Sequence, residues 1–125
     1  MKASLLHQLS KSIEGTVKQD KLSKTLYATD ASVYRKMPIG VAFPKTKADI
    51  QKIVSFAYAH QIGIIPRTAG TSLAGQCVGE GLVVDVSKHF TKILELDIAK
   101  KQVRVEPGVI RDELNAFLAP HAPIQ

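Results

Sequence analysis

A stretch of small and polar residues, PRTAGTSLAGQCVG at residues 66–79, separates two runs of β-branched residues. Gly70, Gly75 and Gly79 permit positive φ, so the main chain there can turn several N–H groups inward as an anion-binding nest. A loop this poor in large side chains cannot satisfy its own N–H groups by burying itself. The side-chain donors within it are Arg67, Thr68, Thr71 and Ser72. Because each charge-assisted hydrogen bond contributes about 1.5–3 kcal/mol, the sequence predicts a phosphate or pyrophosphate ligand.

The two best-known phosphate-loop motifs do not match this stretch. A Walker A loop, G-x-x-x-x-G-K-[ST], fits the spacing from Gly70 to Gly75, but Gln76 and Cys77 stand where Lys and Ser or Thr are required. A dinucleotide fingerprint, G-x-G-x-x-G, is missing, and no helical pattern begins directly after Gly75. Two interpretations therefore stay open from the residues alone: a phosphate-binding loop of another kind, or a surface loop that is rich in glycine without binding anything.

Other chemically capable residues favour simpler roles. Ser72, His89 and Asp97 lack the G-x-S-x-G elbow of a serine hydrolase. Cys77 is interpreted as a small residue lining the loop, and Asp85, at the end of an apolar run, as an acceptor for backbone N–H groups. The histidines lie far apart, without metal-ligand spacing, so we expect no metal site; they are His7, His60, His89 and His121.

The loop must be positioned by the elements on either side of it, and the patterns predict an α+β fold. A sheet with mixed strand directions should be flanked by helices. The predicted helices cover 3–13, 46–63 and 109–120, and the predicted strands cover 40–44, 64–66, 82–86, 92–97 and 102–107. The last three strands are expected to form a meander, and residues 25–38 are expected to be irregular.

Two helices carry more specific signals. The T-x-x-D pattern from Thr46 to Asp49 predicts an N-cap, and Gly63 is expected to end that helix. The predicted inward face of this helix is Ile50, Ile53, Val54, Ala57 and Tyr58. The predicted inward face of the last helix, after the Pro107–Gly108 turn, is Val109, Ile110, Leu114, Phe117 and Leu118.

Composition restricts the class of protein. With 125 residues, 45% hydrophobic and 22% charged, the chain is expected to be one globular unit. The net charge of +6 comes from residues 1–62, but those lysines are scattered and not interleaved with aromatic residues, which disfavours a nucleic-acid binder. No apolar run approaches the roughly 20 residues needed to cross a bilayer, and no secretory signal is visible, so we expect a cytoplasmic protein.

The segments IGIIPRTAGTSLAGQCVGEGLVVDVSKHFTKILELD and VRVEPGVIRDELNAFLAPHAP resemble the FAD-binding domain of flavoprotein oxidases and dehydrogenases typified by vanillyl-alcohol oxidase and p-cresol methylhydroxylase (PCMH). YATDASVYRKMP and VAFPKTKADIQKIVSFAYAHQ extend this resemblance upstream, and within the family the chain is most similar to the D-lactate/glycolate dehydrogenase-like branch. The resemblance implies the N-terminal α/β subdomain of the PCMH-type fold. Residues 1–38 would then be a helix and crossing segment, and residues 39–125 the α/β subdomain with the pyrophosphate loop at 66–79.

The resemblance also implies which residues meet the cofactor. The residues implied to wrap the FAD pyrophosphate are Arg67, Thr68, Ala69, Gly70, Thr71, Ser72 and Leu73, those lining the same cradle are Gly75, Gln76 and Cys77, and those at a turn near the cofactor are Pro107 and Gly108. Relatives that hold flavin covalently often use a histidine in this loop. Thr71 stands at the matching position, which implies non-covalent FAD.

The family's FAD domain continues past the point that matches Gln125 and is followed by a substrate domain, so the chain resembles an N-terminal piece and is expected to be inactive alone. The resemblance implies a parent FAD-dependent dehydrogenase that oxidises a 2-hydroxy acid, such as D-lactate or glycolate, by hydride transfer to FAD. The alternatives are a stand-alone nucleotide- or phosphate-binding module without catalysis and a basic nucleic-acid binder.

Overall fold

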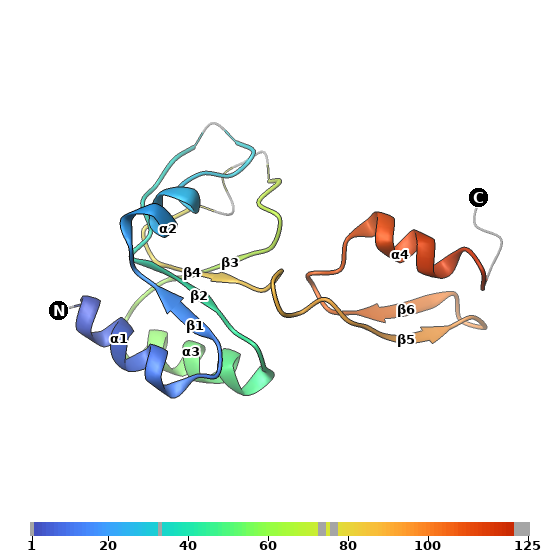
Figure 1. The fold of residues 1–125 in the computed structure, drawn as a ribbon, viewed down its shortest axis with the longest axis horizontal. Coiled ribbons are helices and arrows are strands. Elements are labelled where there is room, and N and C mark those ends of the chain that lie inside the picture. Colours follow the sequence, from blue (N-terminus) through green and yellow to red (C-terminus); the bar gives the residue numbers. More distant parts are fainter. Residues whose placement is uncertain (1, 33, 73–74, 76–77, 122–125) are drawn as a thin grey trace.

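Two separate sheets organise the chain in the computed structural model, which describes residues 2–32, 34–72, 75 and 78–121 (Figure 1). In chain order the elements are α1 (Lys2–Ser12), β1 (Thr16–Lys18), α2 (Lys21–Leu26), β2 (Gly40–Phe43), α3 (Lys47–Ala59), β3 (Ile64–Arg67), β4 (Leu82–Asp85), β5 (Ile93–Asp97), β6 (Gln102–Val105) and α4 (Arg111–Leu118). The first sheet has four strands in the order β1-β2-β4-β3, and the second is the β5-β6 pair.

The four-stranded sheet has mixed strand directions, as predicted. β1 pairs antiparallel with β2, whereas β2, β4 and β3 are parallel to one another. The register places Arg67, the last residue of β3, opposite Asp85, the last residue of β4. The carboxyl ends of these two strands therefore lie next to each other.

Side chains on the two faces of this sheet form two cores. One face, covered by α1 and α3, buries Leu6, Leu9, Ile13, Ala42, Ile53, Leu82 and Val84. The opposite face, on the side of α2, buries Val41, Phe43 and Val83, with Tyr27 and Ile65 packed against them. This alternation follows the period of two along β2 and β4, and it explains why every residue of both strands is buried.

The β5-β6 hairpin and α4 form the second part of the molecule (Figure 1). The predicted hairpin is confirmed, but the predicted three-strand meander is wrong, because β4 is a central strand of the parallel sheet. A strand buried on both faces cannot supply the one wet face that a meander of this kind needs, and residues 82–85 are buried throughout.

Short elements and helix faces differ from the sequence predictions. β1 and α2 were not predicted, because three- and six-residue elements carry too little periodicity to be recognised. On α3, Val54 and Tyr58 are 52% and 89% exposed, and the inward residues are Asp49, Ile53 and Ala57, spaced by one helical turn. α3 ends at Ala59 before Gly63, and Gln61 takes the positive φ.

The closing helix is less covered than its pattern predicts. In α4 no residue is buried: Phe117 is 40% exposed, and the N-cap residue Ile110 is 59% exposed. The predicted apolar face is therefore only partly packed, because the two-stranded sheet beside it offers little surface to bury it against.

Asp49 joins α1, β1 and α3. The predicted cap is confirmed: Thr46 Oγ1 accepts from Asp49 N at 3.1 Å. The Asp49 carboxylate, 1% exposed, accepts N–H groups from Glu14, Gly15 and Lys45, each at 2.9 Å. Burial alone raises the pKa of the Asp49 carboxyl, but these three backbone hydrogen bonds outweigh burial and hold that pKa below its usual value.

We predict that Asp49→Asn lowers the free energy of unfolding by about 2 kcal/mol, because the amide leaves buried N–H groups without a full set of acceptors. Urea unfolding measures this loss. Asp20→Asn is the matched control, since Asp20 is the N-cap of α2 and asparagine caps as well as aspartate does.

The same carboxylate predicts acid sensitivity. Because the pKa of Asp49 is lower in the folded chain than in the unfolded chain, its contribution is complete above the usual carboxyl pKa of about 4 and is lost as the pH falls through the folded value. Stability measured below pH 5 should fall less in Asp49→Asn than in the unchanged chain. Parallel pH profiles for the two proteins would contradict this assignment.

Candidate functional site

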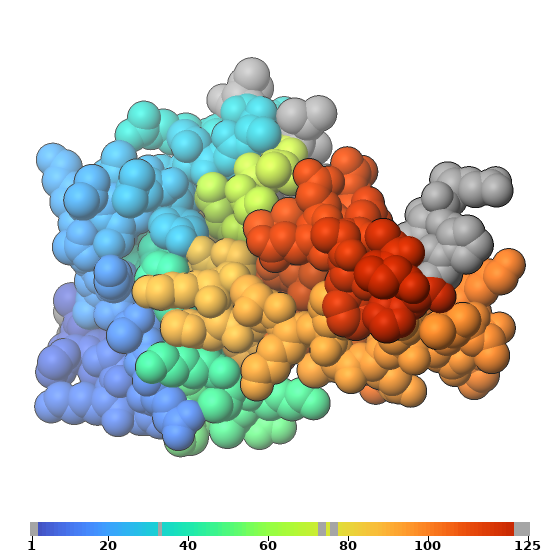
Figure 2. All heavy atoms as spheres, turned by 45° about the vertical axis from the view of Figure 1, so that its right-hand side comes forward, coloured from blue at the N-terminus to red at the C-terminus, as the bar shows by residue number. Residues whose placement is uncertain are grey.

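An open cleft of about 890 Å³ lies beyond the carboxyl ends of β3 and β4. One wall is the start of the loop after β3, another is the segment after β4, and the third is the turn between β6 and α4. In Figure 2 the yellow-green part of the chain adjoins the orange-red part at the surface. The lining residues are Thr68, Ala69, Thr71, Ser87, Thr91, Pro107, Gly108, Val109, Ile110, Arg111, Asp112 and Glu113. This edge of an open parallel sheet is where such folds bind ligands.

The loop after β3 presents backbone donors at this cleft. Within the described part of the chain, the N–H groups of Thr68, Ala69, Gly70 and Thr71 donate to no other residue. Gly70 has φ +70 and its carbonyl accepts from Ala31 N at 2.9 Å, which ties the loop to the segment before β2. Consecutive unpaired amides beside exposed threonines make a binding surface for an anion.

The turn before α4 reaches the cleft through a close backbone approach. Gly108 N donates to Phe90 O at 2.7 Å, and a Cβ at Gly108 would lie 2.5 Å from that oxygen, so only glycine fits. This contact places the N-terminus of α4 on the cleft wall, and its N-cap, Ile110, supplies no side-chain cap. The free amides there favour an anion, whereas the carboxylates of Asp112 and Glu113 oppose it.

A hydrogen-bonded group supports the base of the loop. The Tyr27 hydroxyl donates to Asp85 Oδ2, and Asp85 Oδ1 accepts from Ser87 N at 2.8 Å. The predicted acceptor role of Asp85 is therefore confirmed. Burial, together with the hydrogen bond to Asp85, raises the pKa of the Tyr27 phenol above its usual value. Tyr27 consequently stays protonated and donates to Asp85.

The structure brings together some of the predicted site residues. Thr68, Ala69, Thr71, Pro107 and Gly108 line the one cleft, although the two groups are far apart in the sequence. Arg67 and Gly70 adjoin it without lining it, and Ser72 lies partly buried in the same loop. Gly75 lines a smaller cleft of about 300 Å³ with Tyr34 and Gly79. Leu73, Gln76 and Cys77 lie outside the described residues.

Sequence reasoning missed part of the cleft. Ser87 and Thr91 follow β4, and residues 109–113 lead into the first turn of α4, yet none was singled out as a site residue. The hydroxyl-bearing residues just after a buried strand were the available signal, since ligands gather at the carboxyl ends of parallel strands.

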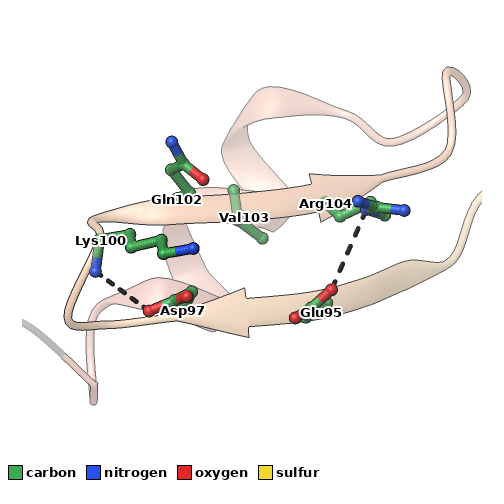
Figure 3. Close-up of a pocket in the computed structure, with 6 residues that line it drawn as sticks. All are labelled: Glu95, Asp97, Lys100, Gln102, Val103 and Arg104. Atoms are coloured by element: carbon green, nitrogen blue, oxygen red, sulfur yellow. Dashed lines mark hydrogen bonds and ion pairs between the residues drawn. The ribbon is translucent and has the colours of Figure 1, made fainter.

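A second hollow, on the β5-β6 hairpin, lacks the features of a site (Figure 3). Glu95, Asp97, Lys100 and Arg104 surround it. The Arg104–Glu95 pair is 4.0 Å long, and its side chains are 74% and 67% exposed, so solvent screens the charges. Among the described residues there is no metal-binding group of His, Cys, Asp or Glu, and no helix is long and apolar enough to cross a membrane.

The fold and cleft thus define an α+β domain whose strand ends carry a loop with unpaired backbone amides among the described residues. The model of the family described as "FAD binding domain" matches residues 38–124, and the chain belongs to this family. The resemblance and the FAD cofactor expected from the sequence are confirmed by this match.

Curated relatives are similar over most of the chain. D-2-hydroxyglutarate dehydrogenase of Haemophilus influenzae is 41% identical over 111 residues, which are 86% of this chain and 11% of that protein. Glycolate oxidase subunit GlcD of Bacillus subtilis is 37% identical over 89 residues, 70% of this chain and 19% of that protein. The chain therefore spans a small part of the length of these relatives.

Solved structures share the fold at low sequence identity. Alkyldihydroxyacetonephosphate synthase superposes with a TM-score of 0.80 at 17% identity, covering 94% of this chain and 25% of that one. p-Cresol methylhydroxylase gives 0.74 at 16% identity, covering 94% and 24%. The predicted PCMH-type fold, a mixed sheet with flanking helices, is confirmed.

The residues of the cleft fit FAD on grounds of the structure itself. A dinucleotide carries two phosphates that need donors. The amides of Thr68–Thr71, which have no partner among the described residues, and the hydroxyls of Thr68 and Thr71 are donors of the kind that would hold such a group. At the corner of this loop Gly70 keeps the positive φ that side chains rarely adopt.

We predict that Gly70→Ala lowers the free energy of unfolding by about 1–2 kcal/mol, because alanine at φ +70 is strained. A Cβ there would also lie 2.3 Å from Arg67 Nη2. Gly63→Ala is the matched control, since a Cβ at Gly63 meets nothing within 4 Å. Equal unfolding midpoints for the two variants would show that the Gly70 corner is not held as described.

Proposed function

We propose that this chain binds FAD non-covalently and holds its pyrophosphate against the N–H groups of residues 68–71. The observation that carries the proposal is the row of amides after β3 that have no partner among the described residues. Three of the four residues line a cleft whose other walls also carry hydroxyl and amide donors. Pro107 and Gly108, on the opposite wall, contact the cofactor from the side of α4.

Each part of the cleft then has a role. The amides of Thr68–Thr71 and the threonine hydroxyls hold the two phosphates, each bond contributing about 1.5–3 kcal/mol. Ser87 and Thr91 contribute further hydroxyls on the side of β4. Leu73, Gly75, Gln76 and Cys77 continue the same cradle in this proposal. Thr71 has no ring nitrogen for a covalent link to flavin, which supports non-covalent attachment.

We also propose that the whole protein is an FAD-dependent dehydrogenase of 2-hydroxy acids. Relatives at 32–41% identity are D-2-hydroxyglutarate dehydrogenase, a glycolate oxidase subunit and the mitochondrial D-lactate dehydrogenase (cytochrome) of Kluyveromyces lactis. All three names refer to an acid with a hydroxyl on the carbon beside the carboxylate. Bound flavin supplies the hydride-accepting chemistry, and the described residues supply binding and orientation. In this division residues 39–125 carry the cofactor loop, and residues 1–38 contribute α1, α2 and the edge strand β1 to the sheet that positions it.

The pyrophosphate proposal predicts a specific order of ligand affinities. FAD and ADP both carry a pyrophosphate and should compete for the cleft, whereas riboflavin, which has no phosphate, should bind at least about tenfold more weakly. Flavin fluorescence quenching and calorimetry with the purified chain measure these affinities. Riboflavin binding as tightly as FAD, or ADP failing to displace FAD, would contradict the assignment.

Two variants connect this binding to the loop. Thr71→Val removes one hydroxyl without much change of shape and should weaken FAD binding about fivefold, the equivalent of about 1 kcal/mol. Gly70→Ala should weaken it more, because the strained corner turns neighbouring amides away from the cleft. Gly63→Ala, on the far side of β3, should leave the affinity unchanged.

The substrate class is tested separately on the whole protein. Anaerobic addition of D-2-hydroxyglutarate, D-lactate or glycolate should bleach the flavin absorbance, whereas the corresponding compound without the hydroxyl should not. Failure of all three acids to bleach the flavin would overturn the dehydrogenase proposal without affecting the binding proposal.

A further inference from the structure

The guanidinium of Arg67 lies against protein groups at the base of the loop. Its carbon Cζ sits 5.0 Å from the centroid of the Tyr27 ring, and Nη1 donates to the Tyr27 carbonyl at 3.4 Å. Arg67 is half-buried and is not among the residues that line the cleft. The one cationic side chain of residues 66–79 therefore contacts Tyr27 and does not line the cleft.

The Tyr27 ring that carries this guanidinium is itself fixed on two sides. Its hydroxyl donates to Asp85 Oδ2, and the ring forms a T-shaped pair with Phe43, with ring centroids 6.0 Å apart. Asp85 is only 5% exposed and is held by Ser87 N and Ser87 Oγ at 2.8 and 2.6 Å. Tyr27 is consequently held in place by a hydrogen bond at the end of β4 and by ring packing on β2.

The other side of the guanidinium faces the corner of the loop. A Cβ at Gly70 would lie 2.3 Å from Arg67 Nη2, which shows how closely the two residues pack. The Gly70 carbonyl accepts from Ala31 N at 2.9 Å, so the segment before β2 also holds the Gly70 corner in place. Gly70 is buried between these contacts, whereas its neighbours Ala69 and Thr71 are exposed.

We propose that Arg67 is a positioning residue of the cofactor loop: stacked on Tyr27, it holds the Gly70 corner so that the amides of residues 68–71 face the cleft, and it does not itself contact the cofactor phosphates. This inference rests on the proposed FAD site. It assigns the loop's only arginine to preorganisation, which reduces the ordering that binding would otherwise require.

Stacking on Tyr27, more than positive charge, explains why position 67 carries arginine and not lysine. The planar guanidinium stacks on an aromatic face and donates from its edge at the same time, whereas a lysine ammonium is a compact point charge. Loss of a partly desolvated stack of this kind should change a local opening equilibrium by roughly 3- to 30-fold.

The first test needs no ligand. Hydrogen exchange of the Ala31 amide, measured by NMR on the purified chain, reports the closed Gly70 corner. Arg67→Lys and Tyr27→Leu should each accelerate exchange roughly tenfold relative to the β4 amides, and the double variant should add no more. Tyr27→Phe keeps the ring and should retain most of the protection. Unchanged exchange at Ala31 in Arg67→Lys would overturn the proposal.

Arg104→Lys is the matched control, because Arg104 is an exposed arginine on the hairpin. It should leave the exchange of Ala31 unchanged. The β4 amides serve as the reference for overall stability, so a variant that is merely less stable raises both rates together and is distinguished from one that opens the corner.

The second test separates positioning from direct contact. If Arg67 acts through Tyr27, Arg67→Lys weakens FAD binding in the unchanged chain but not in the Tyr27→Leu background, whatever the salt concentration. If Arg67 touches phosphate, the loss persists in that background and the salt dependence of binding falls with it, which would overturn the proposal. If the unchanged chain binds no FAD, the proposed function is refuted. The exchange experiment uses no ligand, so it still tests whether Arg67 holds the Gly70 corner.

Discussion

The parallel pairing of β3 with β4 is the constraint on which the cleft depends. Neighbouring parallel strands need a connection that returns the chain to the starting edge of the sheet, and this connection is usually a helix that satisfies its own backbone. Here the connection covers residues 68–81, and its described part contains no helix. Among the described residues, the N–H groups of residues 68–71 are consequently left without a protein partner, so that a ligand or water can pair with them.

The remainder of the structure fixes the position of that loop. Asp49 joins α1, β1 and α3 beneath the sheet, while Tyr27, Asp85 and Arg67 brace the strand ends. On the opposite side of the cleft, the contact of Gly108 with Phe90 brings in the start of α4. In the proposed site, binding energy for an anionic cofactor comes from backbone groups that folding has already ordered, which lowers the entropic cost of binding.

Features that depend on residues close in sequence, such as helix caps and buried strands, were predicted from the sequence. The Thr46 cap needs only residues three apart, and the apolar runs of β2 and β4 follow from burial on both faces. Strand partners do not follow from periodicity, so β4 was assigned to a meander. The hydrogen bond from Tyr27 to Asp85 joins residues 58 apart in sequence, and neither has a local pattern that indicates the other. The glycine-rich loop could be recognised from its composition, which excludes self-burial. The contribution of residues 109–113 to the cleft could not, because only the fold brings them next to the loop.

The central claim is that main-chain amides of residues 68–71 hold a pyrophosphate, and the most direct measurement is the NMR shift of assigned amides as FAD is added to the labelled chain. We predict the largest shifts at Thr68, Ala69, Gly70 and Thr71, with smaller shifts at Gly108 and the first residues of α4, and none in β1 or on the outer face of the hairpin. FAD binding that shifts the hairpin amides and leaves residues 68–71 unmoved would contradict the account.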